Sequence, residues 1–175
     1  QGRNSGVIHS GLYYRPGSYR AKNCVNGRKQ LVAFAKEYNI KHDICGKVVV
    51  AVSDDELPRL DKIYETGKAN GLEGVEKIDV QRLKDIEPYA EGIAALWVPE
   101  AGIIDFVGVT NVLADLIKEI NPNSEIKTSC EVQSFNKGEV SAITTSQGLF
   151  FARKLIFCGG LHSDRLARKD NVKLD

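Results

Sequence analysis

The feature that most constrains this fold is a change of pattern at Asn121-Pro122. Upstream, apolar residues between 106 and 120 recur at the i, i+3, i+4 spacing of an amphipathic helix, which Asp105 is placed to cap. Downstream, short turn-forming segments separate three apolar stretches: 125–135, 139–145 and 149–157. The sequence therefore predicts a three-stranded β-meander after a first part that mixes helices and strands, and an α+β fold overall.

The first part opens with helix and strand signals in turn. Ser18 is a plausible cap for a helix over 19–38, which Asn39 ends. Residues 48–52 are a continuous, mostly β-branched run, which predicts a buried strand. The S-x-x-E pattern of 53–56 has the form of a capping box and predicts the start of a second helix.

Shorter elements complete the first part. We expect a short strand near 75–78 and a short helix after Asp79. A strand at 93–98 carries Trp97, for which a half-buried packing role and a place in a ligand cavity are both open. Residues 102–105 are expected to form a corner.

Composition excludes several classes of function. The net charge is +1, with 24 basic and 23 acidic residues of mixed distribution, which argues against nucleic acid or an acidic membrane surface as the main partner. The four cysteines are widely spaced and no His cluster occurs, so neither a metal site nor a disulfide framework is expected. No apolar run is long enough to span a membrane. Reduced thiols in the cytoplasm are the default expectation.

The opening residues, 1–14, gather polar donors in a turn. Gly2 and Gly6 bracket Arg3, Asn4 and Ser5, side chains that can hold phosphate or sugar oxygens. His9 follows within an apolar stretch. The simpler interpretation is a surface turn that leads into a strand, with His9 a structural histidine, and the residues alone leave both interpretations open.

A second glycine pattern lies near the other end of the chain. Residues 155–158 form an apolar run that predicts a buried strand, followed by Gly159-Gly160 and a short helix at 163–167. A strand that ends in two glycines before a helix lets a cofactor lie against bare backbone. As a pattern alone this signal is weak.

Two expected features are missing. No G-x-G-x-x-G follows a strand, so the pyrophosphate site of a dinucleotide-binding fold is absent. The chain also contains no methionine, so we expect it to be an excised fragment, although loss of an N-terminal tail by cleavage would look the same.

Four segments carry a resemblance to a known family: GRNSGVIHSGLYYRPGSYRAKNCVNG, CGKVVVAVSDDELPRL, IEPYAEGIAALWVPEAGIIDF and KLIFCGGLHSDRLA. In this order they resemble the FAD-dependent L-2-hydroxyglutarate oxidase/dehydrogenase family, of the D-amino-acid-oxidase and glycerol-3-phosphate-dehydrogenase group. The resemblance implies an α+β flavoprotein fragment. A mixed or antiparallel sheet with helices on one face would form the substrate-binding cap (39–123), and the β-meander and a returning strand would belong to an incomplete FAD-binding domain (1–38 and 124–175).

The resemblance also implies roles for individual residues. The residues expected at the FAD are Arg3, Asn4, Ser5 and Gly6 along the ribityl–pyrophosphate region, Val132 at the adenine through its backbone, and Gly159 and Gly160 close to the cofactor. His9 would accept the substrate's hydroxyl proton, a task suited to an imidazole. Tyr13, Tyr14 and Arg15 would help bind substrate carboxylates. Val107 departs from the family, where a basic residue is common, and this puts the substrate in doubt.

The function implied is oxidation of a small 2-hydroxy acid, L-2-hydroxyglutarate to 2-oxoglutarate, by hydride transfer to flavin N5. Oxygen and a quinone are both open as electron acceptor, and a peripheral position on a membrane is left open beside the cytoplasmic location. The alternatives are a sister FAD enzyme that acts on glycerol 3-phosphate or an amino acid, and a non-catalytic binding domain that lost its nucleotide site. The chain alone is expected to hold FAD weakly or not at all and to be inactive.

Overall fold

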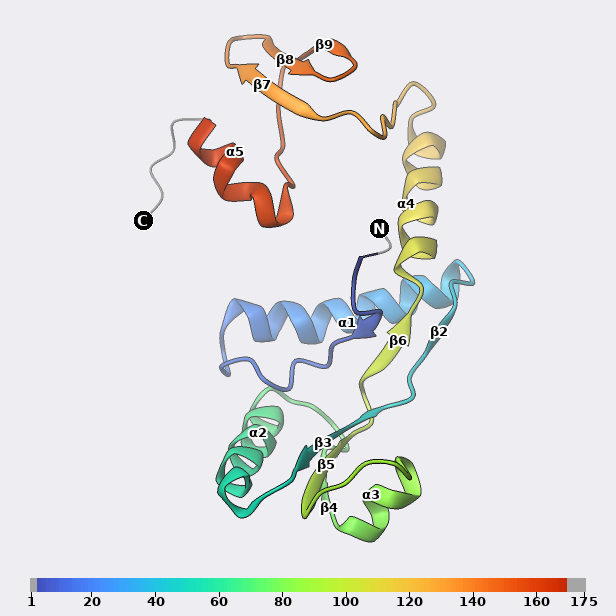
Figure 1. Ribbon diagram of the computed structural model, residues 1–175. Coiled ribbons are helices and arrows are strands. Elements are labelled where there is room, and N and C mark those ends of the chain that lie inside the picture. The colour runs from blue at the N-terminus through green and yellow to red at the C-terminus, as the bar shows by residue number, and fades with distance from the viewer. Residues whose placement is uncertain (1–2, 170–175) are drawn as a thin grey trace. The chain divides into compact units, whose positions relative to one another are not determined.

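The computed structural model describes residues 3–169 (Figure 1). Gly2 of the predicted donor turn and the last six residues of the predicted segment 124–175 lie outside this range. The chain divides into two compact units, Gln1–Pro122 and Asn123–Asp175, which are described separately below. The assignment of residues 1–38 and 39–123 to different functional domains stays a prediction.

Helices and short antiparallel strands alternate along the first unit. Its elements are β1 (Val7–Ile8), α1 (Tyr19–Glu37), β2 (His42–Asp43), β3 (Lys47–Ala51), a 3-10 turn (Asp54–Glu56), α2 (Leu57–Ala69), β4 (Glu76–Ile78), α3 (Val80–Ile86), β5 (Ala94–Val98), β6 (Gly102–Ile104) and α4 (Phe106–Ile120). The strands form two sheets of order β1-β6-β2 and β3-β5-β4. The predicted α+β class is confirmed.

Short polar side chains cap the helices α1 and α4. The Ser18 hydroxyl accepts a hydrogen bond from the Ala21 N–H at 3.2 Å, and the Asp105 carboxylate accepts from Val107 and Gly108 at 3.0 Å each, as predicted. The capping box predicted at 53–56 is wrong in detail. The Ser53 hydroxyl makes no capping bond, because Glu56 reaches one residue further back, to the Val52 N–H at 2.8 Å. Residues 54–56 therefore form a 3-10 turn before α2.

The sheet β3-β5-β4 lies between two helices. Antiparallel pairing places Val49 opposite Leu96 on one face and Val48 opposite Trp97 on the other. The face with Leu96 packs against α2, and the face with Trp97 packs against α3. We expected helices on one face only; both faces are covered because successive residues of β5 are apolar. Within the run 48–52, which was predicted as buried, residues 48–50 are partly buried, Ala51 is buried and Val52 is 62% exposed.

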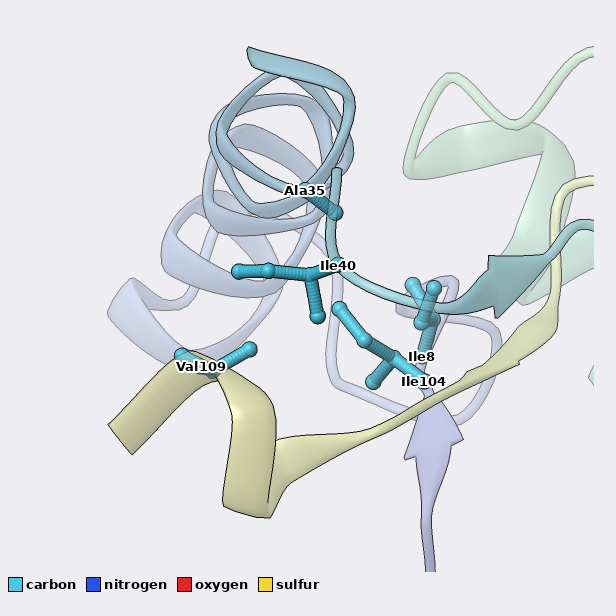
Figure 2. Packing of buried hydrophobic residues seen from close by; sticks show 5 residues of the cluster. All are labelled: Ile8, Ala35, Ile40, Ile104 and Val109. Carbon is cyan, nitrogen blue, oxygen red and sulfur yellow. The ribbon is translucent and has the colours of Figure 1, made fainter. Parts of the chain in front are cut away.

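The sheet β1-β6-β2 anchors the opening residues to the rest of the unit. Residues 102–104, expected as part of a corner, form strand β6, which pairs with β1 on one side and β2 on the other. Figure 2 shows the core that covers this sheet, where side chains from β1, α1, the segment after α1, β6 and α4 meet: Ile8, Ala35, Ile40, Ile104 and Val109. Position 8 is thereby fixed in the core, which orients the residues on either side of it.

Helix α4 is only partly covered within the first unit. Val109 is buried and Val112 packs against the same core. The predicted apolar stripe continues beyond this contact, so Leu113 and Ile117 are each 47% exposed and Ile120 is 84% exposed. The helix is longer than the core beside it.

The second unit contains the predicted β-meander. Its strands, β7 (Val132–Asn136), β8 (Ser141–Thr145) and β9 (Gly148–Ala152), pair in sequence order and are followed by a 3-10 turn (Gly160–His162) and α5 (Ser163–Lys169), which confirms the predicted short helix. The strands are shorter than predicted. The returning strand expected at 155–158 is not formed, because no strand among the described residues pairs with it, and Ile156 is 89% exposed.

Candidate functional site

The polar turn before β1 is held by its own side chains. Asn4 Oδ1 accepts a hydrogen bond from the Gly6 N–H at 2.7 Å, and the Ser5 hydroxyl accepts from the Val7 N–H at 3.4 Å. Gly6 has φ +68°, the left-handed region that favours glycine, and its carbonyl accepts from the Ile104 N–H at 2.8 Å. Arg3, Asn4 and Ser5 are exposed. The turn therefore presents polar side chains to solvent from a backbone fixed to β6.

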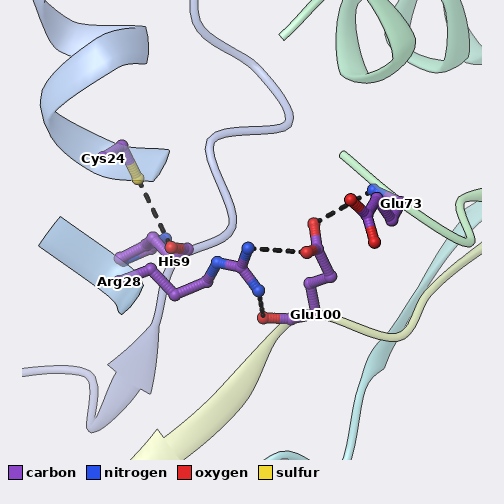
Figure 3. Close-up of polar contacts among 5 residues, drawn as sticks. All are labelled: His9, Cys24, Arg28, Glu73 and Glu100. Carbon is purple, nitrogen blue, oxygen red and sulfur yellow. Dashed lines mark hydrogen bonds and ion pairs between the residues drawn. The ribbon is translucent and has the colours of Figure 1, made fainter. Parts of the chain in front are cut away.

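His9 projects to solvent from an otherwise buried stretch. Its neighbours Ile8 and Ser10 are each 1% exposed. Its backbone carbonyl accepts a hydrogen bond from Cys24 Sγ on α1 at 3.4 Å (Figure 3). Burial raises the pKa of the Cys24 thiol, opposed by the positive charges of Arg28 and Lys47. A raised pKa keeps the thiol protonated, which it must be to donate this bond.

Arg28, on the same helix as Cys24, forms a partly buried ion pair with Glu100. Arg28 Nη2 is 2.6 Å from Glu100 Oε1, and Arg28 Nη1 donates to the Glu100 carbonyl at 3.4 Å (Figure 3). Glu100 Oε2 accepts from the Glu73 N–H at 3.3 Å. This network connects α1 with the turn after β5 and the segment after α2, so it fixes the elements around the His9 backbone.

The residues after His9 are attached to α2. Asn70, which caps the end of α2, donates from Nδ2 to the carbonyls of Gly11 at 2.9 Å and Tyr14 at 2.8 Å. Leu12 is 1% exposed, and a Cβ added to Gly67 would lie 2.7 Å from its Cδ1. Glycine at position 67 therefore allows the helix to approach the loop closely.

Of the three predicted substrate-binding residues, the structure brings one next to a cation. Lys47 Nζ donates to the Tyr13 hydroxyl at 3.4 Å and lies 4.5 Å from the centre of its ring. Tyr13 is 53% exposed, Tyr14 is partly buried and Arg15 is exposed. Lys47 was not among the predicted substrate-binding residues, since it is 34 residues from Tyr13 in the sequence and only the folded chain brings the two together.

An apolar cavity of about 360 Å³ borders the polar turn. It lies along β2 and β6 and is lined by Gly6, Lys41, His42, Asp43, Ile103, Ile104 and Asp105. The His42 ring is oriented by a 2.8 Å contact between Nδ1 and the Ile40 carbonyl. The cavity offers an apolar surface directly beside the exposed donors of residues 3–6.

The predicted cofactor residues of the second unit differ in accessibility. Val132 begins the edge strand β7, opposite Thr145, and is 39% exposed. A Cβ at Gly159 would lie 2.6 Å from Leu166 Cδ1, so this glycine accommodates α5. Gly160 has φ +54° and nothing within 4 Å of an added Cβ. Bare, open backbone is thus offered at Gly160.

Residues 3–169 contain no group of three or more His, Cys, Asp or Glu side chains arranged to hold a metal ion. All four cysteines are free. Within the same range, every helix is too short or too polar to cross a bilayer.

The whole chain, residues 1–175, matches the FAD dependent oxidoreductase family. The chain belongs to this family. Its cofactor class is FAD, and the chain contains groups that fit it: the exposed polar side chains at residues 3–5 suit phosphate and sugar oxygens, and Gly160 offers bare backbone. These observations are compatible with the predicted cofactor residues, whose individual roles stay predictions.

Relatives of this flavoprotein chain share one described activity. This chain is 42% identical over 167 residues to the L-2-hydroxyglutarate dehydrogenase of Indibacter alkaliphilus, and the match covers 95% of this chain and 42% of that protein. It is 38% identical over 169 residues to the Escherichia coli L-2-hydroxyglutarate dehydrogenase, covering 95% and 39%. The chain thus spans about two-fifths of the length of these relatives.

Solved flavoproteins share the fold. The L-alpha-glycerophosphate oxidase from Mycoplasma pneumoniae, solved with FAD bound, matches with a TM-score of 0.80 and 25% identity over 94% of this chain and 45% of that one. Glycine oxidase from Geobacillus kaustophilus matches with a TM-score of 0.82 and 19% identity over 97% and 48%.

Proposed function

We propose that this chain is part of an FAD-dependent enzyme that oxidises L-2-hydroxyglutarate to 2-oxoglutarate. The observation that carries the proposal is the 42% identity to an L-2-hydroxyglutarate dehydrogenase across 95% of the chain. When bound, FAD supplies the acceptor for the hydride that leaves C2 of the substrate. The protein's own tasks are to bind the cofactor, orient the substrate and remove the hydroxyl proton.

His9 is the proposed proton acceptor. The His9 imidazole is exposed and so accessible to a bound substrate, and its backbone is held by Cys24 with buried residues on both sides. Arg3, Asn4, Ser5 and Gly6 would bind FAD on this unit. In the second unit the proposed FAD-binding residues are Val132, through its backbone, Gly159 and Gly160.

Tyr13, Tyr14 and Arg15 are proposed to bind the substrate, and we add Lys47 to this proposal because it lies beside Tyr13. A dicarboxylate requires cations, and the Lys47 ammonium lies at the Tyr13 hydroxyl and ring. Lys47 therefore supplies a cation close to the segment that carries His9.

The decisive experiment is anaerobic mixing of the FAD-loaded, full-length protein with L-2-hydroxyglutarate. Loss of the oxidised flavin absorbance is expected. His9→Ala should slow this reduction by about 10²–10⁴-fold, the usual contribution of a general base, and added imidazole should restore part of the rate. Equal rates in the two proteins would exclude His9 as the base. Oxygen and a quinone can then be compared as acceptors of the electrons.

A second substrate class is favoured by one structural match. The glycerophosphate oxidase shares 25% identity and a TM-score of 0.80 with this chain, and Val107 replaces a residue expected to be basic. If glycerol 3-phosphate or an amino acid bleaches the flavin and L-2-hydroxyglutarate does not, the protein is a related FAD enzyme with that other substrate. Flavin unchanged by all three would support a binding role without catalysis.

The proposed setting is the cytoplasm, on the ground that all four cysteines are free thiols. Cell fractionation of the full-length protein tests this. Recovery at a membrane surface would support the peripheral alternative, and recovery in an organelle would contradict both.

A further inference from the structure

Two adjoining cavities lie between Tyr13 and helix α2. They measure about 320 Å³ and 480 Å³, and both are lined by Tyr13, Arg59 and Ile63. The smaller one also contacts Val49 and Leu60, which belong to the apolar packing between β3 and α2. One wall of the space is thus apolar, and the tyrosine ring forms another.

The charged side chains around this space are mostly cationic. Arg59 lines both cavities and Lys62 lines the larger one. Neither side chain has a hydrogen bond or ion pair with any described residue. Glu56 is the acidic residue in the lining, and its Oε2 already accepts a hydrogen bond from the Val52 N–H at 2.8 Å. Arg59 and Lys62 therefore have charge and donors available for an anion.

Lys47, which lies over the Tyr13 ring, adds to the positive potential beside these cavities. Its ammonium is 3.4 Å from the Tyr13 hydroxyl, and the tyrosine can still donate its own O–H to an anion. Asp61, the next acidic residue on α2, is engaged by Lys77 at 2.7 Å. Apolar walls beside unpaired cations are the arrangement that suits a carboxylate on a short aliphatic chain.

We propose that the space between Tyr13 and α2 binds an aliphatic dicarboxylate, with Arg59 and Lys62 at one carboxylate and the Val49–Leu60 wall against the carbon chain. The choice of a dicarboxylate rests on the proposed function. The site itself requires no redox step. The proposal gives α2 a part in binding the carboxylate, in addition to the opening residues.

The test uses glutarate, which has the carbon chain and both carboxylates but no hydroxyl group to oxidise. Isotope-labelled protein is titrated with glutarate and the amide shifts are followed by NMR. Shifts are expected at Tyr13 and along α2. Arg59→Gln should weaken binding by about fivefold, the effect of losing roughly 1 kcal/mol from an exposed charged contact. Lys68→Gln, an exposed lysine of the same helix outside both cavities, should change the affinity less than about twofold.

Three results would overturn the proposal. They are the absence of shifts at Tyr13 and α2, equal losses in Arg59→Gln and Lys68→Gln, and inorganic phosphate binding as tightly as glutarate, which would show attraction of any anion. Flavin reduction is measured separately, so glutarate binding can succeed when L-2-hydroxyglutarate oxidation fails, and the reverse. Circular dichroism of each variant verifies that a loss of binding is not a loss of fold.

Discussion

The Asn70 side chain donates to the Gly11 carbonyl at 2.9 Å and uses the same nitrogen for the Tyr14 carbonyl at 2.8 Å. One residue at the end of α2 thus satisfies two carbonyls of the loop that follows His9. With the Cys24 thiol on the His9 carbonyl, the segment is held at both ends by side chains of helices. The backbone that carries the proposed base and substrate contacts is therefore fixed before any ligand binds.

Asn70→Ala is expected to lower the free energy of unfolding by about 1–3 kcal/mol, because two partly buried carbonyls lose their donor. Urea denaturation measures this. Asn70→Asp keeps the shape but presents a carboxylate to the same carbonyls, so its loss should equal or exceed that of alanine. An aspartate variant as stable as wild type would show that the two hydrogen bonds contribute nothing.

Glu100→Ala is expected to lower the unfolding free energy of the first unit more than the double variant Arg28→Ala/Glu100→Ala does. The single variant leaves the Arg28 guanidinium partly buried without its carboxylate, at a cost of about 2–3 kcal/mol, and the double variant removes that unpaired charge. A double-mutant cycle of unfolding free energies gives the coupling. Additive losses would mean that the 2.6 Å pair has no net interaction.

Local chemistry made much of the fold predictable. Ser18 and Asp105 were identified as helix caps because a short polar side chain before an apolar repeat satisfies backbone N–H groups in any context. The β-meander was predictable because turn-forming residues separate its strands, and such turns are also determined locally. The strand predicted at 155–158 failed because a strand exists only with a pairing partner, and apolar composition does not supply one.

The site was predictable only in part. His9 and the donor turn are contiguous in sequence, so a motif could indicate them. The contacts that fix them join residues far apart, such as Arg28 with Glu100, 72 positions away, and Lys47 with Tyr13. No spacing rule predicts such pairs, because they form only when segments far apart in the sequence pack together.

Cys24 should make the stability of the protein depend on alkaline pH. Its thiol has a raised pKa, so it loses its proton at a higher pH in the folded protein than in the unfolded chain. This contribution is fully present below the ordinary thiol pKa of about 8.5 and is lost as the pH rises through the raised value. Thermal melts between pH 8 and 10 should fall more steeply for wild type than for Cys24→Ala, and parallel curves would contradict the assignment.

Gly46 and Gly17 provide a matched pair for separating backbone strain from packing. Both have positive φ, +74° and +77°, so alanine is strained at either position. Only at Gly46 does an added Cβ collide with a side chain, 2.0 Å from the Trp97 ring, whereas at Gly17 nothing lies within 4 Å. Gly17→Ala should cost about 1–2 kcal/mol from strain alone.

Gly46→Ala should cost a further 1–3 kcal/mol or so, since the ring must move within a packed face of the sheet β3-β5-β4. Trp97 is the single tryptophan of the chain, so its fluorescence reports the displacement directly. We expect a shifted emission maximum for Gly46→Ala and an unchanged one for Gly17→Ala. Equal stabilities and equal spectra would mean that the ring is not seated against Gly46, and that the approach of β3 to β5 is set by backbone pairing alone.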